Sequence, residues 1–368
     1  MTIEQAKVRK KLRLFCVLLA SVVACAVALH ALAPEVFERH KRRGPGAIPL
    51  AIVGDSNSHS YHDSIMLSKP SVRGGTFRAS TWQWTEVLQE LRPESFDQGD
   101  FRTWGSKIKL AELLDAIGVG GRAPRKRDFR FNFAVSAAQC DDLFNGYYRQ
   151  VPRLLSEMRR DREFWNGGIV VIYMGVNSMG QPPHLESYAK HGLTPENSKA
   201  IDNCVAETRR AVEAIRREIA GIRIVLVGIF DGTGEPGAIQ RWQTPEEMGR
   251  IRMALARFDN GLRQIADSDK LTVFFDLRNW AIETWGIRAD DGSAQFRDMV
   301  LPSGMRVRFS IGDDPSNAVL RDEHAGTVWN ALFARSLVSL LNQRFQLGIR
   351  EIELAEVSTL PNRTVPLP

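Results

Sequence analysis

The order of apolar and amphipathic segments constrains the fold of this 368-residue chain more than any other feature. Short, nearly continuous apolar runs occur at residues 48–53, 129–135, 168–174, 222–228 and 271–276. Such runs suit strands that are covered on both faces of a sheet. Between them, apolar residues recur at helical spacing in segments 83–92, 107–117, 141–160, 201–220, 245–267 and 323–344. Five strands that alternate with helices predict a doubly wound parallel sheet, which is a three-layer α/β/α sandwich.

The positive charge of the chain is concentrated at its N-terminus. The net charge is +6, and residues 1–45 alone carry nine Lys or Arg against three Glu. The rest of the chain therefore has 40 basic and 40 acidic residues. A domain with equal numbers of basic and acidic residues does not attract polyanions, so we expect no nucleic-acid partner.

An uncharged apolar stretch at about residues 14–33 predicts a membrane segment. Its 20 residues are long enough to cross a bilayer core. The favoured interpretation is a signal anchor between a basic cytoplasmic stub and a tether that ends near residue 45. This interpretation predicts a single-pass protein of the bacterial inner membrane whose body lies in the periplasm. Two alternatives are a secreted protein cleaved at Ala31-Leu32-Ala33 and a lipoprotein modified at Cys25.

For the chain beyond residue 45, the sequence predicts one domain, residues 46–350, and an extended tail, residues 351–368. Residues 54–128 and 277–320 are expansions, and the second has room for a short hairpin. Long expansions often form substrate walls or lids. Two cysteines of the body, Cys140 and Cys204, either pair in an oxidising compartment or remain separate buried thiols.

Gly54-Asp55-Ser56 follows the first apolar run directly and places a serine hydroxyl at the tip of a strand. In open α/β sheets this tip borders the ligand crevice. A serine there can be a nucleophile when a base and an oxyanion site lie nearby. Asp322 and His324 supply an acid and a base near the C-terminus.

The chain resembles the SGNH/GDSL hydrolase family over roughly residues 48–340. The resemblance depends on five residues in the order typical of the family: Ser56, Ala137, Asn177, Asp322 and His324. The resemblance implies a flavodoxin-like sheet and a serine esterase. It implies that Ser56 is the nucleophile, that His324 is the base and that Asp322 orients the imidazole. The oxyanion hole would comprise the backbone N–H groups of Ser56 and Ala137 and the amide of Asn177.

Three positions depart from the family pattern. Ala137 stands where the family usually has Gly, and Ser178 stands where an Asp usually follows the Asn. The acid precedes His324 by two residues instead of three, because Arg321 occupies the usual position. The helix that follows also offers Asp322 a role as an N-cap.

The sequence thus predicts a membrane-anchored serine hydrolase that cleaves O-acyl esters of small molecules or glycans, without cofactor or metal. Alternatives are an O-acyltransferase or deacetylase of envelope glycans, a metal-dependent phosphoesterase and an inactive ligand-binding module. The phosphoesterase would use Asp55, His59 and His62 as ligands. Three tryptophans of the first expansion either line a substrate groove or belong to the core: Trp82, Trp84 and Trp104.

Overall fold

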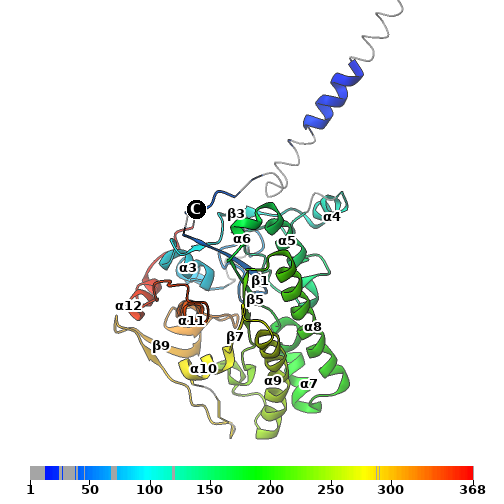
Figure 1. Cartoon of the computed structure of the whole chain (residues 1–368). Coiled ribbons are helices and arrows are strands. Elements are labelled where there is room, and N and C mark those ends of the chain that lie inside the picture. The colour runs from blue at the N-terminus through cyan, green and yellow to red at the C-terminus, as the bar shows by residue number, and fades with distance from the viewer. Residues whose placement is uncertain are drawn as a thin grey trace, which may run out of the picture.

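The structure is a computed structural model (Figure 1). It describes residues 13–24, 27, 38, 40–44, 46–67, 73–117, 121–286, 288–289 and 291–367. Cys25 and the predicted cleavage site at residues 31–33 lie outside the described residues.

A five-stranded parallel sheet forms the centre of the molecule, in the order β2-β1-β5-β6-β7. Its strands are β1 (Ile48–Gly54), β2 (Phe96–Asp97), β5 (Ile169–Tyr173), β6 (Arg223–Val227) and β7 (Thr272–Phe275). The doubly wound α/β fold predicted from the alternation of segments is therefore confirmed. Four of the five predicted strands are β1, β5, β6 and β7.

The fifth predicted strand, residues 129–135, is not a regular member of this sheet. Its first residue ends β4 (Lys126–Phe129), which pairs antiparallel with β3 (Phe101–Trp104). The chain then runs irregularly beside β1, where the Phe133 N–H donates to the Ile52 carbonyl at 2.7 Å. The Asn132 side chain accepts from the Ala134 N–H at 3.0 Å and donates to the Ser58 carbonyl at 2.7 Å. Such local side-chain bonds compete with a strand ladder. The edge strand β2 pairs with the start of β1, at Ile48 and Pro49.

Helices and short helical turns connect the strands. The longer helices are α3 (Trp84–Leu91), α4 (Ile108–Ala116), α5 (Gln150–Arg160), α7 (Pro182–His191), α8 (Pro195–Glu218), α9 (Pro245–Asp267), α10 (Leu277–Trp285) and α11 (Thr327–Phe345). The short ones are α6 (Arg162–Trp165), α12 (Leu354–Val357), η1 (Gly75–Ser80), η2 (Cys140–Leu143), η3 (Val176–Gly180), η4 (Gly232–Gly234), η5 (Pro236–Ala238) and η6 (Leu360–Asn362).

Two predicted helices have different boundaries in the structure. Segment 141–160 divides into η2 and α5, because Gly146 between them has a left-handed φ of 62°. The last long helix begins at Thr327, and its N-cap is Gly326. Asp322 is therefore not the N-cap of α11, and His324 lies in the turn before it. By contrast, α9 has the predicted bounds, and a capping box between Thr244 and Glu247 fixes its start.

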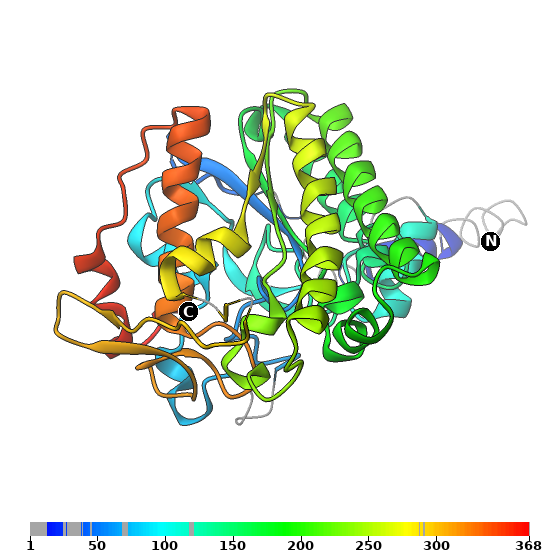
Figure 2. The same ribbon diagram turned by 90° about the horizontal axis from the view of Figure 1, so that it is seen from below.

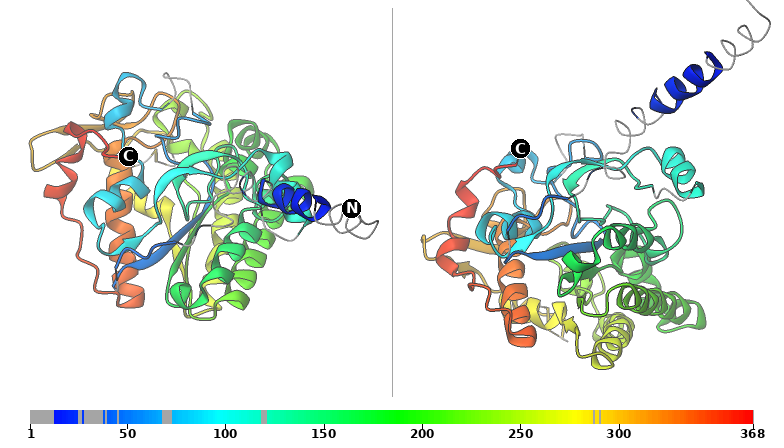
Figure 3. Two further views of the ribbon diagram at one scale, coloured as in Figure 1. Left: turned by 90° about the horizontal axis from the view of Figure 1, so that it is seen from above. Right: turned by 45° about the horizontal axis from the view of Figure 1, so that its top comes forward.

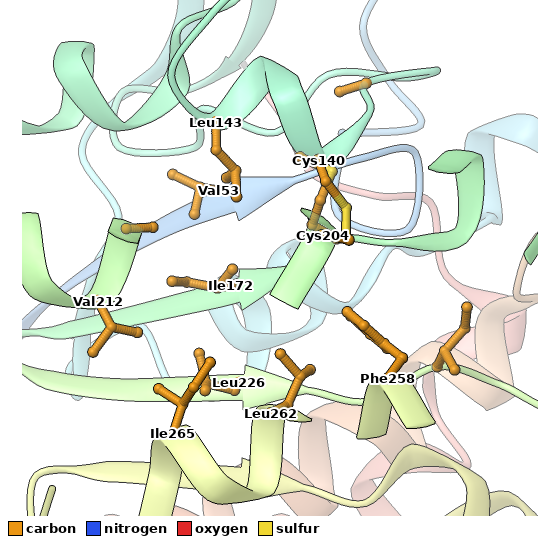
Figure 4. Packing of buried hydrophobic residues seen from close by; sticks show 14 of the residues in the cluster. Val53, Cys140, Leu143, Ile172, Cys204, Val212, Leu226, Phe258, Leu262 and Ile265 are labelled. Carbon is orange, nitrogen blue, oxygen red and sulfur yellow. A yellow bond between two sulfur atoms is a disulfide. The ribbon is translucent and has the colours of Figure 1, made fainter. Parts of the chain in front are cut away.

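Each face of the sheet contributes to a separate hydrophobic cluster, because successive side chains of a strand point to opposite faces. Val53, Ile172 and Leu226 pack with α5, α8 and α9 on one face (Figure 4). Ile52, Val171 and Val225 pack with α3, α10 and α11 on the other. The two helical layers lie on opposite sides of the sheet in Figures 2 and 3.

The second expansion contains the expected hairpin, formed by β8 (Met299–Val300) and β9 (Arg306–Ile311), and β10 (Asn317–Val319) pairs parallel with β9. The C-terminal tail differs from the expectation of an extended segment. It contains α12 and η6, and Val357 and Leu360 are completely buried. The Leu360 carbonyl accepts a hydrogen bond from the indole of Trp82 at 3.0 Å, so the tail belongs to the core.

The structure describes the predicted membrane anchor in part, at residues 14–24 and 27 of the segment 14–33. Residues 13–24 are helical, and their apolar side chains are exposed. Within the described part of the chain, no helix has the length and apolar character needed to cross a membrane.

Candidate active site

A pocket of about 260 Å³ opens at the carboxyl ends of the central strands. Residues that follow β1, β5 and β6 line it, including Ser56, Met174 and Gly228. Asp322 and His324 approach from the turn before α11. The pocket thus lies at the sheet edge where ligands bind in open α/β folds.

Ser56 occupies the first turn after β1. The turn is closed by N–H groups of Ser58 and His59, which both donate to the Asp55 carbonyl at 3.2 Å. The Asp55 side chain supports it, because its Oδ1 accepts from the Asn57 N–H at 2.9 Å. Burial raises the pKa of Asp55 to about 7, against the lowering effect of Asn57 and of Arg73. This turn places Ser56 in the lining of the pocket and leaves Asp55 inside the protein.

Asp322 and His324 contact each other across one intervening residue. The Asp322 Oδ2 lies 3.1 Å from Nδ1 of His324. Glu323 between them has a left-handed φ of 66°, and this reversal of the backbone brings both side chains to the same side. Burial alone would raise the pKa of Asp322, but the hydrogen bond and charge of His324 and the charge of Arg73 lower it. Asp322 is therefore ionised beside the imidazole at neutral pH.

Arg73 is the other neighbour of His324. Its Nη2 lies 3.3 Å from His324 Nε2 and donates to the Ser136 Oγ at 2.9 Å. Its Nε lies 3.7 Å from Asp322 Oδ2, and its guanidinium stands 5.2 Å from the ring centroid of Tyr61. The side chain is only 3% exposed. Among the described residues, His324 Nε2 thus faces Arg73 and makes no hydrogen bond with Ser56.

A buried histidine orients Ser136. His59 Nδ1 accepts from the Ser136 N–H at 3.2 Å, so its other nitrogen carries the proton and donates to Asp63 at 2.9 Å. The Ser136 hydroxyl, 2.8 Å from Nδ1, then donates to that same nitrogen. Burial and the nearby Lys126 lower the pKa of His59, which keeps the imidazole neutral. The lone pairs of Ser136 Oγ remain for Arg73.

The two remaining predicted oxyanion donors lie together beside the pocket. The Asn177 side chain donates to the Ala138 carbonyl at 3.0 Å, so η3 contacts the loop that contains Ala137. Ala137 has a left-handed φ of 66°, the conformation for which glycine is favoured. Among the described residues that line the pocket, neither Ala137 nor Asn177 is present. Their role as donors stays a prediction.

A disulfide anchors this loop. Cys140 and Cys204 are bonded and connect η2 to α8 (Figure 4). The Cys140 N–H also donates to the Ser178 hydroxyl of η3 at 2.9 Å. Of the two alternatives left by the sequence, the pair of cysteines therefore forms a bond, next to the predicted oxyanion region.

The lining of the pocket also contains aromatic and acidic groups. Trp329, Trp242 and Phe230 line it together with Glu235. Burial, followed by the charges of Glu323 and Asp231, raises the pKa of Glu235 to about 8, although Arg241 opposes the shift. This shift favours the protonated form of Glu235 at neutral pH, and Glu235 lines the pocket.

The residues considered for a metal site have other partners. His59 bonds Asp63 and Ser136, and His62 Nδ1 lies 3.0 Å from the carboxylate of Glu86. Within the described residues, no group of three or more His, Cys, Asp or Glu side chains is arranged to hold a metal. The tryptophans of the first expansion form part of the core instead of a groove: Trp82, Trp84 and Trp104 are at most 1% exposed.

Sequence reasoning missed Arg73, Ser136 and the part played by His59. The only local sign was the spacing of His59 and Asp63, four residues apart. Nothing in the sequence indicates that Arg73 reaches a histidine 251 positions later.

No protein-family profile and no curated protein matches the chain. In fold it is similar to protein YxiM of Bacillus subtilis, with 12% identity and a TM-score of 0.39 over 83% of this chain and 58% of that one. An extracellular lipase from Streptomyces rimosus has 14% identity and a TM-score of 0.36, covering 78% of this chain and 100% of the lipase. A family 3 carbohydrate esterase from Clostridium thermocellum has 11% identity and a TM-score of 0.36, covering 83% of this chain and 100% of the esterase. Similarities with such low sequence identity and TM-scores do not indicate an activity, so an activity has to be supported by the geometry of the pocket.

Proposed function

We propose that the chain is a serine ester hydrolase of the SGNH type, with Ser56 as nucleophile, His324 as base and Asp322 as the orienting acid. The observation that carries the proposal is the 3.1 Å contact between Asp322 and His324 in a pocket that Ser56 also lines. A carboxylate on Nδ1 leaves Nε2 as the acceptor, which is the arrangement that a triad requires.

The reaction follows from these positions. The Ser56 Oγ attacks the ester carbonyl while its proton passes to Nε2 of His324. Backbone N–H groups of Ser56 and Ala137 and the amide of Asn177 stabilise the oxyanion, and one such donor is typically worth about 3 kcal/mol. His324 then protonates the departing alcohol, and water cleaves the acyl-enzyme by the same proton transfers in reverse.

The dimensions and chemistry of the pocket support a compact ester. A volume of about 260 Å³ accommodates a short acyl group with part of an alcohol. Aromatic rings such as Trp329 with a protonated Glu235 suit an alcohol that carries hydroxyl groups. Acetylated sugars meet both requirements. An acyltransferase would use the same site with a sugar hydroxyl in place of water.

A fluorophosphonate probe tests the proposal, because it labels only an activated serine. We expect labelling of the purified protein, loss of labelling in Ser56→Ala, and strong loss in His324→Ala and Asp322→Asn. The exposed His191 at the end of α7 provides the matched histidine control, and His191→Ala should label fully. Absence of labelling in protein shown to be folded would favour a non-catalytic binding module.

We further propose that residues 14–33 anchor this hydrolase in the inner membrane, with the body in the periplasm. The uncharged 20-residue stretch and its basic flanks support the anchor. The Cys140–Cys204 bond supports an oxidising compartment. The full chain should resist extraction by alkaline carbonate and dissolve in detergent. Recovery of a shortened chain in the soluble periplasmic fraction would instead indicate cleavage.

A further inference from the structure

Arg73 is a buried cation whose charge is only partly compensated. Its Nη2 has two acceptors, but its Nε and Nη1 have no hydrogen-bond partner among the described residues. The nearest carboxylate oxygen, Oδ2 of Asp322, is 3.7 Å away and also contacts His324. A buried charge normally requires a paired and hydrogen-bonded partner. The residues that the structure describes do not complete this pairing.

The position of the guanidinium is nevertheless well defined. The Ser136 hydroxyl donates its hydrogen bond to His59 Nδ1, so Ser136 Oγ can only accept from Arg73. The Tyr61 ring supports the guanidinium from the side. Arg73 itself has a left-handed φ of 52°, a strained conformation for this residue type, and its guanidinium contacts Asp322 and His324, which line the pocket. Strained residues of this kind concentrate at functional sites.

The location of Arg73 relates it to the reacting atoms. Its Nη2 lies 3.3 Å from His324 Nε2, the atom that has to accept the proton of Ser56. In the free protein, the acceptor lone pair of the base is thus directed at Arg73. A negatively charged oxygen is a stronger acceptor than a neutral imidazole, because charge-assisted hydrogen bonds are about twice as strong.

Resting on the hydrolase function proposed above, we infer that Arg73 selects esters that carry a carboxylate a few atoms from the scissile carbonyl. The substrate carboxylate pairs with the guanidinium and draws it from Nε2 of His324. The freed lone pair then accepts the Ser56 proton. A monoanion fits better than a phosphate dianion, because Asp322 and Glu323 already place negative charge on the pocket wall.

Two pairs of esters test this inference, and each pair differs only in charge. The first pair places the charge in the acyl part: 4-nitrophenyl hydrogen succinate and its methyl ester. The second places it in the alcohol part: 4-acetoxybenzoate and its methyl ester. The measured quantity is the ratio of kcat/KM for the charged and the neutral member of each pair. It is determined for the unaltered protein, Arg73→Met, Arg73→Lys and the control Arg321→Met.

We expect Arg73→Met to lower this ratio about 10- to 100-fold in at least one pair, the effect of losing a hydrogen bond between charged groups. Its kcat/KM on the neutral member should change less than its kcat/KM on the charged member, because the neutral ester has no carboxylate that pairs with Arg73. Arg73→Lys should retain part of the preference. Arg321, whose side chain is 82% exposed on the same turn as Asp322, controls for general charge effects, and Arg321→Met should leave the ratio unchanged.

An equal loss on charged and neutral esters, or an unchanged ratio in both pairs, would overturn the inference. Binding of 4-acetoxybenzoate to Ser56→Ala provides a second readout by calorimetry, independent of turnover. The double variant Ser56→Ala with Arg73→Met should not bind 4-acetoxybenzoate. Binding that persists in this double variant would also overturn the inference. Absence of turnover and of fluorophosphonate labelling together with Arg73-dependent binding would instead reject only the hydrolase proposal.

Discussion

At the scale of single residues, left-handed backbone conformations shape the candidate site. Arg73, Ala137 and Glu323 all have a positive φ although none is glycine. Glu323 lies between Asp322 and His324 at the pocket, Arg73 contacts both of these residues, and Ala137 is a predicted oxyanion donor. Non-glycine residues adopt this region at a cost, so the surrounding structure has to impose it.

Ala137→Gly tests this view. Glycine adopts a φ of 66° without strain, so the substitution should raise the free energy of unfolding by about 1 kcal/mol and retain labelling of Ser56. Chemical denaturation with urea measures the change. The adjacent Ala138 is completely buried and has no positive φ, so Ala138→Gly should destabilise the protein instead. A loss of stability in Ala137→Gly comparable to that of Ala138→Gly would contradict this account.

At the scale of elements, the Cys140–Cys204 bond holds three parts of the fold together. It links η2 to α8, and the Cys140 N–H bonds the Ser178 hydroxyl of η3. The loop that contains Ala137 and the turn that contains Asn177 are thereby held against the same helix. The predicted oxyanion region is thus next to a covalent link between segments 64 residues apart in the chain.

Removing this link should destabilise the protein by about 2–4 kcal/mol, because the unfolded chain loses a constraint. The double variant Cys140→Ser with Cys204→Ser, and the unaltered protein under reductant, should show the same fall in urea unfolding. Reductant should have no further effect on the double variant, which serves as its control. An unaltered protein that keeps its stability after complete reduction would argue against the role given to the bond.

At the scale of the whole molecule, buried acids with raised pKa values make stability depend on pH. Burial raises the pKa of Glu235 to about 8, of Asp55 to about 7 and of Asp259 to about 6. Each group binds a proton in the folded state over a pH range in which the unfolded chain has released it. Folding stability therefore falls as the pH rises from the ordinary carboxyl range through these values.

Glu235→Gln should remove the contribution with the highest pKa. The variant should gain stability relative to the unaltered protein as the pH rises from 5 to 9, with little difference at pH 5. Free energies of unfolding at several pH values measure the trend. Glu94 is exposed, so Glu94→Gln should follow the unaltered protein throughout. A constant difference between Glu235→Gln and the unaltered protein across this range would show that Glu235 does not titrate as described.

The sequence by itself determined the layers of the fold. Apolar runs and helical periodicity are local signals, and they located β1, β5, β6 and β7 and the bounds of α9. They also indicated Ser56 at a strand tip and Asp322 beside His324, because these residues are adjacent to strong local patterns or to each other.

Only the tertiary structure decided the edge strand, the packing of the tail and the surroundings of the base. β2 pairs with the start of β1, while Asn132 lies irregularly beside Ile52. The tail packs into the core, where the Trp82 indole donates to the Leu360 carbonyl. Arg73 reaches Ser136 and His324 across 63 and 251 positions. Such contacts depend on how distant segments pack, and neither periodicity nor local spacing contains that information.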